Sequence, residues 1–129
     1  LNPNGDTSMC LDVQDGVFTN GTPVQIWNCN GTPAQQWDLN WGPTTIRLGT
    51  TGFCLDASTA DPSNGTPMKI WDCLDVPQQN WISTVTPAGG IVGLANTGVC
   101  LDLRGGSHTP GTVVQAWQCV QAETNQIWT

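Results

Sequence analysis

Residues 10–29 read CLDVQDGVFTNGTPVQIWNC, and similar stretches occupy residues 54–73 and 100–119. Each stretch begins with Cys-Leu-Asp, places a Trp fifteen residues after the Asp, and ends with a second Cys two residues later. A Gln-x-Trp follows every stretch, at residues 35–37, 79–81 and 126–128. Such regular self-similarity is the signature of a repeat architecture. We therefore predict a single domain over residues 1–129, built from three repeats at approximately 1–44, 45–88 and 89–129.

The cysteines share one spacing. Within each repeat the two cysteines lie 19 residues apart, in the pairs Cys10 and Cys29, Cys54 and Cys73, and Cys100 and Cys119. An even cysteine count in a short chain is typical of disulfides and an oxidising compartment. Zinc is the alternative, but it favours closely spaced cysteines or clustered histidines, which this sequence lacks. We predict one disulfide per repeat in a secreted, extracellular protein, and we expect the chain to be a processed or excised form because it shows no initiator Met or signal peptide.

The composition excludes several classes of function. Three Lys and Arg stand against ten Asp and Glu, for a net charge of -7, which argues against nucleic-acid binding. No apolar run approaches 18 residues, so we expect no membrane insertion. One His and one Glu leave few candidates for acid–base or metal chemistry, and we expect no cofactor. Fifteen Gly, nine Pro and a scarcity of helix-favouring residues indicate an all-β domain.

Alternation along the short strands at residues 10–13 and 24–29 separates two faces. Side chains of a strand point alternately to opposite sides, and a disulfide joins cysteines on the same side. The aliphatic side is the natural core. Each repeat then presents an Asp, a second polar or charged side chain and a Trp on its outward face: Asp12, Gln25 and Trp27; Asp56, Lys69 and Trp71; Asp102, Gln115 and Trp117.

The three ordered copies of Cys-Leu-Asp and Gln-x-Trp, covering essentially the whole chain, resemble the ricin B-type lectins and carbohydrate-binding modules. The resemblance implies a β-trefoil of three pseudo-symmetric repeats with twelve short strands, four in each repeat. It also implies that the Trp of each Gln-x-Trp lies in the core and that its Gln bonds the backbone. These core Trp residues would be Trp37, Trp81 and Trp128.

The same resemblance implies the binding residues. In this family the repeated Asp accepts hydrogen bonds from sugar hydroxyls, the Trp before the second Cys stacks on the sugar ring, and an Asn before the Gln-x-Trp assists. The third repeat is complete, whereas the first has Ala34 in place of the Asn. The second has Lys69 in place of the Gln and Gln78 in place of the Asn. The candidate carbohydrate-binding residues are Asp12, Gln25, Trp27, Asp56, Trp71, Gln78, Asp102, Gln115, Trp117 and Asn125.

These residue types suit a sugar. An indole offers a flat apolar platform to the C–H face of a pyranose, and a carboxylate accepts strong bonds from its hydroxyls. One monosaccharide contributes about 3.6 kcal/mol at roughly 0.3 kcal/mol per atom, so a single site binds near millimolar. Up to three shallow sites would therefore act together on a multivalent glycan. The resemblance favours glycans containing galactose or N-acetylgalactosamine. The alternatives are a xylan-binding module of a secreted glycoside hydrolase and a trefoil protease inhibitor acting through a loop.

Catalysis is not expected. A glycosidase needs two carboxylates within about 9.5 Å. A chain of this length has a radius of gyration of about 14 Å, so three symmetric Asp residues would lie roughly 20 Å or more apart. We therefore predict a binding protein and not an enzyme.

Several residues have plainer interpretations. The outward Trp residues could simply pack against the disulfides, and the repeated Asp could serve local turns. Sequons at Asn20, Asn30 and Asn64 fit N-glycosylation, although Asn-Gly is also a turn signal. We expect His108 to be a solvated loop residue and Trp41 to lie in a loop packed on the core, with an extra surface contact as the alternative for Trp41. The first repeat offers only Asn2 and Asn4 where the others have Ile46-x-Leu48 and Val92-x-Leu94, so we predict that neighbouring sequence has been removed or that the terminal strands are short.

Overall fold

The computed structural model describes residues 1–129 and contains eleven short strands, with five single turns of 3-10 helix and no α-helix. The strands are β1 (Met9–Val13), β2 (Val24–Asn28), β3 (Trp37–Asp38), β4 (Gly42–Thr44), β5 (Arg47–Leu48), β6 (Phe53–Asp56), β7 (Lys69–Asp72), β8 (Trp81–Ser83), β9 (Val92–Leu94), β10 (Val99–Leu103) and β11 (Val114–Gln118). The 3-10 turns are η1 (Gln14–Gly16), η2 (Pro33–Gln35), η3 (Pro77–Gln79), η4 (Arg104–Gly106) and η5 (Thr124–Gln126). None of these turns is long and apolar enough to cross a membrane.

One antiparallel hairpin recurs in each repeat: β1 with β2, β6 with β7, and β10 with β11. In the first hairpin Cys10 pairs with Trp27 and Asp12 with Gln25, and the other two hairpins keep this register. The predicted disulfides are present, one in each repeat. Because paired residues share a face, the register confirms that Asp, its polar or charged partner and Trp lie on the side of the disulfide.

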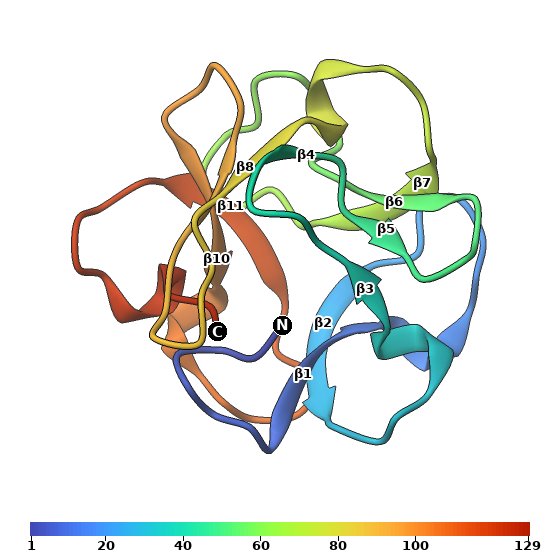
Figure 1. The fold of residues 1–129 in the computed structure, drawn as a ribbon, viewed down its shortest axis with the longest axis horizontal. Coiled ribbons are helices and arrows are strands. Elements are labelled where there is room, and N and C mark those ends of the chain that lie inside the picture. The colour runs from blue at the N-terminus through green and yellow to red at the C-terminus, as the bar shows by residue number, and fades with distance from the viewer.

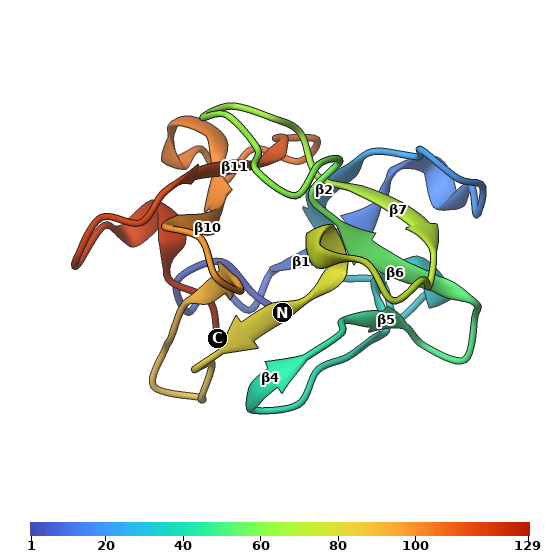
Figure 2. The ribbon, with the colours of Figure 1, turned by 90° about the horizontal axis from the view of Figure 1, so that it is seen from above.

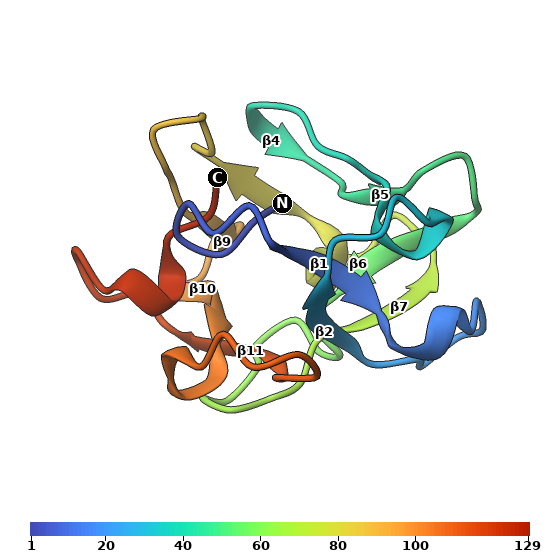
Figure 3. The ribbon, with the colours of Figure 1, turned by 90° about the horizontal axis from the view of Figure 1, so that it is seen from below.

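The three repeats surround a common axis and form the predicted β-trefoil. In Figure 1 the blue, green and red parts of the chain make three lobes around the centre. Figures 2 and 3 show β4 at one end of the molecule and the light-green turn before β7 at the opposite end. The sheets are ordered β1-β2, β3-β5-β6-β7 and β11-β10-β9-β8-β4.

The core is aliphatic and is closed by indoles. Twenty buried hydrophobic residues form one cluster, which includes the whole predicted inward face of the first hairpin. Trp81 and Trp128 are fully buried, and Trp37 is partly buried against the same cluster. Each of these indole N–H groups donates to the carbonyl of the Leu of Cys-Leu-Asp in its own repeat, at 3.0 to 3.1 Å. In each repeat, the Trp of the Gln-x-Trp therefore connects the end of the repeat to its hairpin.

The N-terminal segment differs from the sequence expectation. Leu1, and not Asn2, corresponds to Ile46, because the Leu1 carbonyl accepts from Leu11 N–H at 2.9 Å as the Ile46 carbonyl accepts from Leu55 N–H at 2.8 Å. Pro3 is buried and bridges to Trp128. One additional residue before Cys10 shifts the spacing, so a search at fixed offsets finds Asn2 and Asn4 instead. Two implied strands, the first of the first repeat and the last of the third, are reduced to this bridge, and β4 is additional.

The turns between paired strands join neighbouring repeats. Gly21 N–H donates to the Ile70 carbonyl at 2.9 Å, and Ile70 N–H donates to the Thr22 carbonyl at 3.0 Å. The turn at Gly65 bonds Ala116 in the same way, and the turn at Gly111 bonds Ile26. These glycines have φ values of +91 to +93°, a region that glycine enters without steric cost. The three repeats are thus linked in a closed cycle.

Candidate functional site

The repeated Asp residues lie beneath the surface, which corrects the prediction that they project outward. Asp12, Asp56 and Asp102 are only 5%, 2% and 4% exposed. In the first repeat Gln35 covers the carboxylate: its Nε2 donates to Asp12 Oδ2 at 2.8 Å and to the Asn28 carbonyl at 2.9 Å, while its Oε1 accepts from Asn30 N–H at 2.9 Å. The Gln of each Gln-x-Trp makes the same three contacts. The expected backbone bonds are present, and the bond to the Asp is additional.

The third repeat forms a cavity of about 620 Å³ beside Trp117, which is 39% exposed. On its floor, Asp102 Oδ1 accepts from Gln115 Nε2 at 3.0 Å, and Oδ2 accepts from Gln126 Nε2 at 3.1 Å. All four residues carried over for this repeat line the cavity: Asp102, Gln115, Trp117 and Asn125. Arg104, Glu123 and the second repeat's Gly65 line it as well. Sequence reasoning did not find these three residues, because Gly65 comes from another repeat and the residue types at the positions of Arg104 and Glu123 differ between the repeats.

The first repeat forms a related cavity of about 500 Å³ beside Trp27, which is 41% exposed. Asp12 Oδ1 accepts from Gln25 Nε2 at 3.2 Å. Ala34 lines the wall where the third repeat has Asn125, as the sequence indicated. Asp15, Phe18, Asn30 and Thr32 also line the cavity and were not predicted.

The buried carboxylates of these two repeats have perturbed acidity. Burial raises the pKa of Asp12 and of Asp102 above the ordinary value, since it disfavours the charged form. The nearby charges of Asp15 and Glu123 act in the same direction, whereas the amide donors oppose it. The amides therefore compensate part of the cost of burying these charges.

The second repeat holds its predicted residues in a different arrangement. Lys69 Nζ lies 4.7 Å from the centre of the Trp71 ring, a distance typical of a cation–π contact. Asp56 Oδ1 accepts from the Ser58 backbone N–H at 2.6 Å, where the other repeats use a Gln amide. Gln78 is half-buried on η3. The register brings Asp56, Lys69 and Trp71 together, but a cation already covers the indole.

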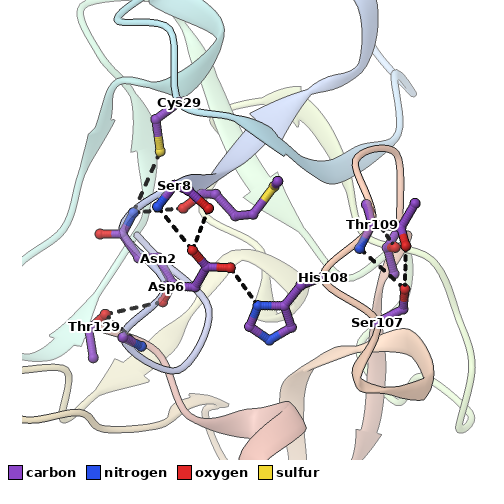
Figure 4. A network of polar contacts seen from close by, with 11 residues as sticks. Asn2, Asp6, Ser8, Cys29, Ser107, His108, Thr109 and Thr129 are labelled. Atoms are coloured by element: carbon purple, nitrogen blue, oxygen red, sulfur yellow. Dashed lines mark hydrogen bonds and ion pairs between the residues drawn. The ribbon is translucent and has the colours of Figure 1, made fainter.

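One loop prediction needs correction, and another is confirmed. Trp41 is 71% exposed and does not pack on the core, because it lies at the bend that leads into β4, outside the strand that pairs with β8. His108 is an exposed loop residue, as predicted, and it also has a partner: its Nδ1 lies 2.7 Å from Asp6 Oδ2, as Figure 4 shows. This contact, with lesser help from Ser8, lowers the pKa of Asp6 to about 2.

Two sequon asparagines have structural roles. Asn20 Oδ1 accepts from Asp72 N–H, and Asn64 Oδ1 accepts from Gln118 N–H, both at 2.7 Å. Each Asn thus anchors a turn on the next repeat. No group of three or more His, Cys, Asp or Glu side chains is arranged to hold a metal ion.

Threefold hairpins, each with a disulfide, a buried Asp and a partly exposed Trp, define a β-trefoil of the lectin type. Residues 3–128 match the family model of the ricin-type beta-trefoil lectin domain, and the chain belongs to this family. No curated protein sequence matches it.

Solved structures share the fold. The designed threefold-symmetric protein ThreeFoil superposes with a TM-score of 0.86 at 22% identity, over 98% of this chain and 92% of that one. An exo-beta-1,3-galactanase from Clostridium thermocellum gives 0.84 at 26% identity, over 99% of this chain and 28% of that one. The ricin B-like lectin of Macrolepiota procera, solved with lactose, gives 0.72 at 23% identity, over 95% and 91%. This chain therefore spans little more than a quarter of the galactanase.

Proposed function

We propose that this domain binds glycans containing galactose or N-acetylgalactosamine through the cavities of its first and third repeats. The main observation in support is that each cavity combines a partly exposed indole with a buried carboxylate held by two Gln amides. The family itself, the lactose-bound fungal lectin and the galactanase that contains this fold support this choice of sugar.

Each group would have its own role in binding. The exposed part of Trp27 or Trp117 would stack on the apolar face of the sugar, which in galactose is broad because the 4-hydroxyl is axial. A carboxylate has about four lone-pair positions, of which the two amides use two. The remaining positions on Asp12 or Asp102 would accept sugar hydroxyls through charge-assisted hydrogen bonds. The amides hold the carboxylate in place before the sugar arrives.

The second repeat is expected to contribute less. A sugar stacking on the Trp71 face beneath Lys69 would first have to displace the ammonium group, which lies 4.7 Å from the ring centre. A cation–π contact contributes about 0.5 to 1 kcal/mol at an exposed site, and displacing it subtracts that amount from an already weak interaction. We therefore expect two principal sites whose affinities combine on a multivalent glycan.

The chemistry of the domain suits a secreted binding protein, either free or as a module of a larger enzyme. Three disulfides favour an oxidising compartment, so we propose an extracellular location. The galactanase provides a precedent for the same fold within a longer chain.

Titration with lactose, N-acetylgalactosamine and xylo-oligosaccharides, followed by NMR, tests the proposal. We expect millimolar binding of the galactosides at two sites. Trp27→Ala and Trp117→Ala should each remove one site, and the double variant should remove both. Trp41→Ala is the matched control, since Trp41 lines neither cavity and should leave binding unchanged. Binding of xylo-oligosaccharides alone, or no binding by the folded wild type, would refute the proposed specificity.

A further inference from the structure

We propose that Arg104 is a positioning residue that fixes Gln115 for sugar binding, so that the third repeat binds more tightly than the first. This inference rests on the proposed carbohydrate function. Arg104 Nε donates to Gln115 Oε1 at 2.8 Å, and Arg104 Nη2 donates to the Gly65 carbonyl at 3.1 Å. One guanidinium thus joins a site residue of the third repeat to a turn of the second.

The first contact determines which way the Gln115 amide points. A guanidinium only donates hydrogen bonds, so it must face the amide oxygen. The amide nitrogen is then directed at Asp102, to which it donates at 3.0 Å. Both ends of the Gln115 side chain are therefore held, and the residue is only 5% exposed.

The first repeat has no arginine contact of this kind. Gln14 occupies the corresponding backbone position, because Gln14 N–H donates to the Pro23 carbonyl as Arg104 N–H donates to the Val113 carbonyl. The Gln14 side chain is exposed. Gln25 is only partly buried and is held by a single, longer bond of 3.2 Å to Asp12. A sugar at this site would have to order Gln25, which reduces the net affinity.

The second contact of Arg104 fixes the border of the same cavity. Gly65 lines the third cavity, and its carbonyl accepts from Arg104. On the other side of this turn, Asn64 accepts from Gln118 N–H at 2.7 Å. The turn is thus anchored from two directions to the repeat whose site it borders. Arg104 acts on the sugar through Gln115 and through this turn.

The test isolates the third site in a Trp27→Ala background and measures its affinity for lactose by NMR titration. Arg104→Gln should raise the dissociation constant by about two- to twelvefold, the effect of ordering one additional side chain on binding. Arg104→Lys should restore only part of this loss, since an ammonium lacks the planar fork that reaches both acceptors. The matched control is Gln14→Ala in a Trp117→Ala background, which should leave the first site unchanged.

A second measurement distinguishes positioning from general destabilisation. Nitrogen-15 relaxation of the Gln115 side-chain amide should report a rigid group in the wild type and a mobile one in Arg104→Gln, with the backbone spectrum otherwise preserved. An unchanged lactose affinity or a still-rigid Gln115 amide in that variant would overturn the inference. If the wild type binds no lactose, the proposed function fails, whereas the amide measurement still decides whether Arg104 holds Gln115.

Discussion

Replacing Gln79 with Leu is expected to destabilise the protein strongly without involving either proposed binding site. Gln79 is fully buried at the foot of the second repeat. Its Nε2 donates to Asp56 Oδ2 at 3.0 Å and to the Asp72 carbonyl at 2.9 Å, and its Oε1 accepts from Leu74 N–H at 2.8 Å. Leucine has a similar size, so the substitution removes polar contacts with little change in volume.

The magnitude follows from what the three partners lose. A buried polar group left without its partner costs about 1 to 3 kcal/mol. Asp72 and Leu74 are exposed residues to which water has access, so each is assigned about 1 kcal/mol at the low end of that range. Asp56 is buried and retains only the Ser58 bond, so its loss is about 2 kcal/mol. The expected total of about 4 kcal/mol is a large share of the 5 to 15 kcal/mol that stabilises a typical protein.

Denaturant unfolding with the disulfides intact, followed by tryptophan fluorescence, measures this loss. Gln78→Leu is the matched control, because Gln78 is the adjacent residue, is half-buried and takes part in none of the three bonds. We expect the control to change the free energy of unfolding by no more than about 0.5 kcal/mol. A loss below about 1 kcal/mol in Gln79→Leu, or equal losses in both variants, would show that the Gln network does not stabilise the fold as argued.

Sugar affinity should fall as the pH decreases, because burial raises the pKa of Asp12 and of Asp102 and a protonated acid is a poorer acceptor than a carboxylate. The fall should begin above the ordinary Asp pKa of 3.8, and a titration of lactose affinity against pH checks this. The same two carboxyl groups hold their protons more tightly in the folded state than in the unfolded state. Their ionisation should therefore lower the free energy of unfolding as the pH rises from 3.8 through the raised pKa. In unfolding measured against pH, Asp102→Asn should show a smaller decrease. Asp6 acts in the opposite direction: its contribution is present above pH 3.8 and is lost as the pH falls towards about 2, so wild type and Asp6→Asn should converge in melting temperature near pH 2. The disulfide between Cys54 and Cys73, which lie 19 residues apart, restricts the entropy of the unfolded chain. Removing it by a double Ala substitution should cost about 3 kcal/mol in the same unfolding assay, and a neutral result would contradict this entropic role.

The repeated spacing was sufficient to predict features that lie within one repeat. The common interval between cysteines predicted the disulfides, and strand alternation predicted that Asp12 shares a face with Gln25 and Trp27. Both depend only on short-range geometry, which is the same in all three copies. The buried position of Trp128 followed from the family resemblance.

Features that depend on long-range contacts could not be predicted in this way. The burial of Asp12 depends on Gln35, which lies 23 residues further along the chain. Alternation assigns a face to a side chain but does not say what covers that face. Lys69 was recognised as a departure, yet its position over Trp71 depends on a side-chain conformation.

The inter-repeat turns have a consequence for how the molecule folds. Three units in an open row share two interfaces, whereas three units in a ring share three. Here the turn at Gly111 in the last repeat bonds Ile26 in the first, which completes the ring. A fragment of two repeats would therefore keep only one of the three interfaces. In one of its hairpins, the second strand would lack the turn from the neighbouring repeat that bonds it in the whole domain. We expect such fragments to remain unfolded, so that stability, and with it any multivalency, is gained all at once when the third unit joins.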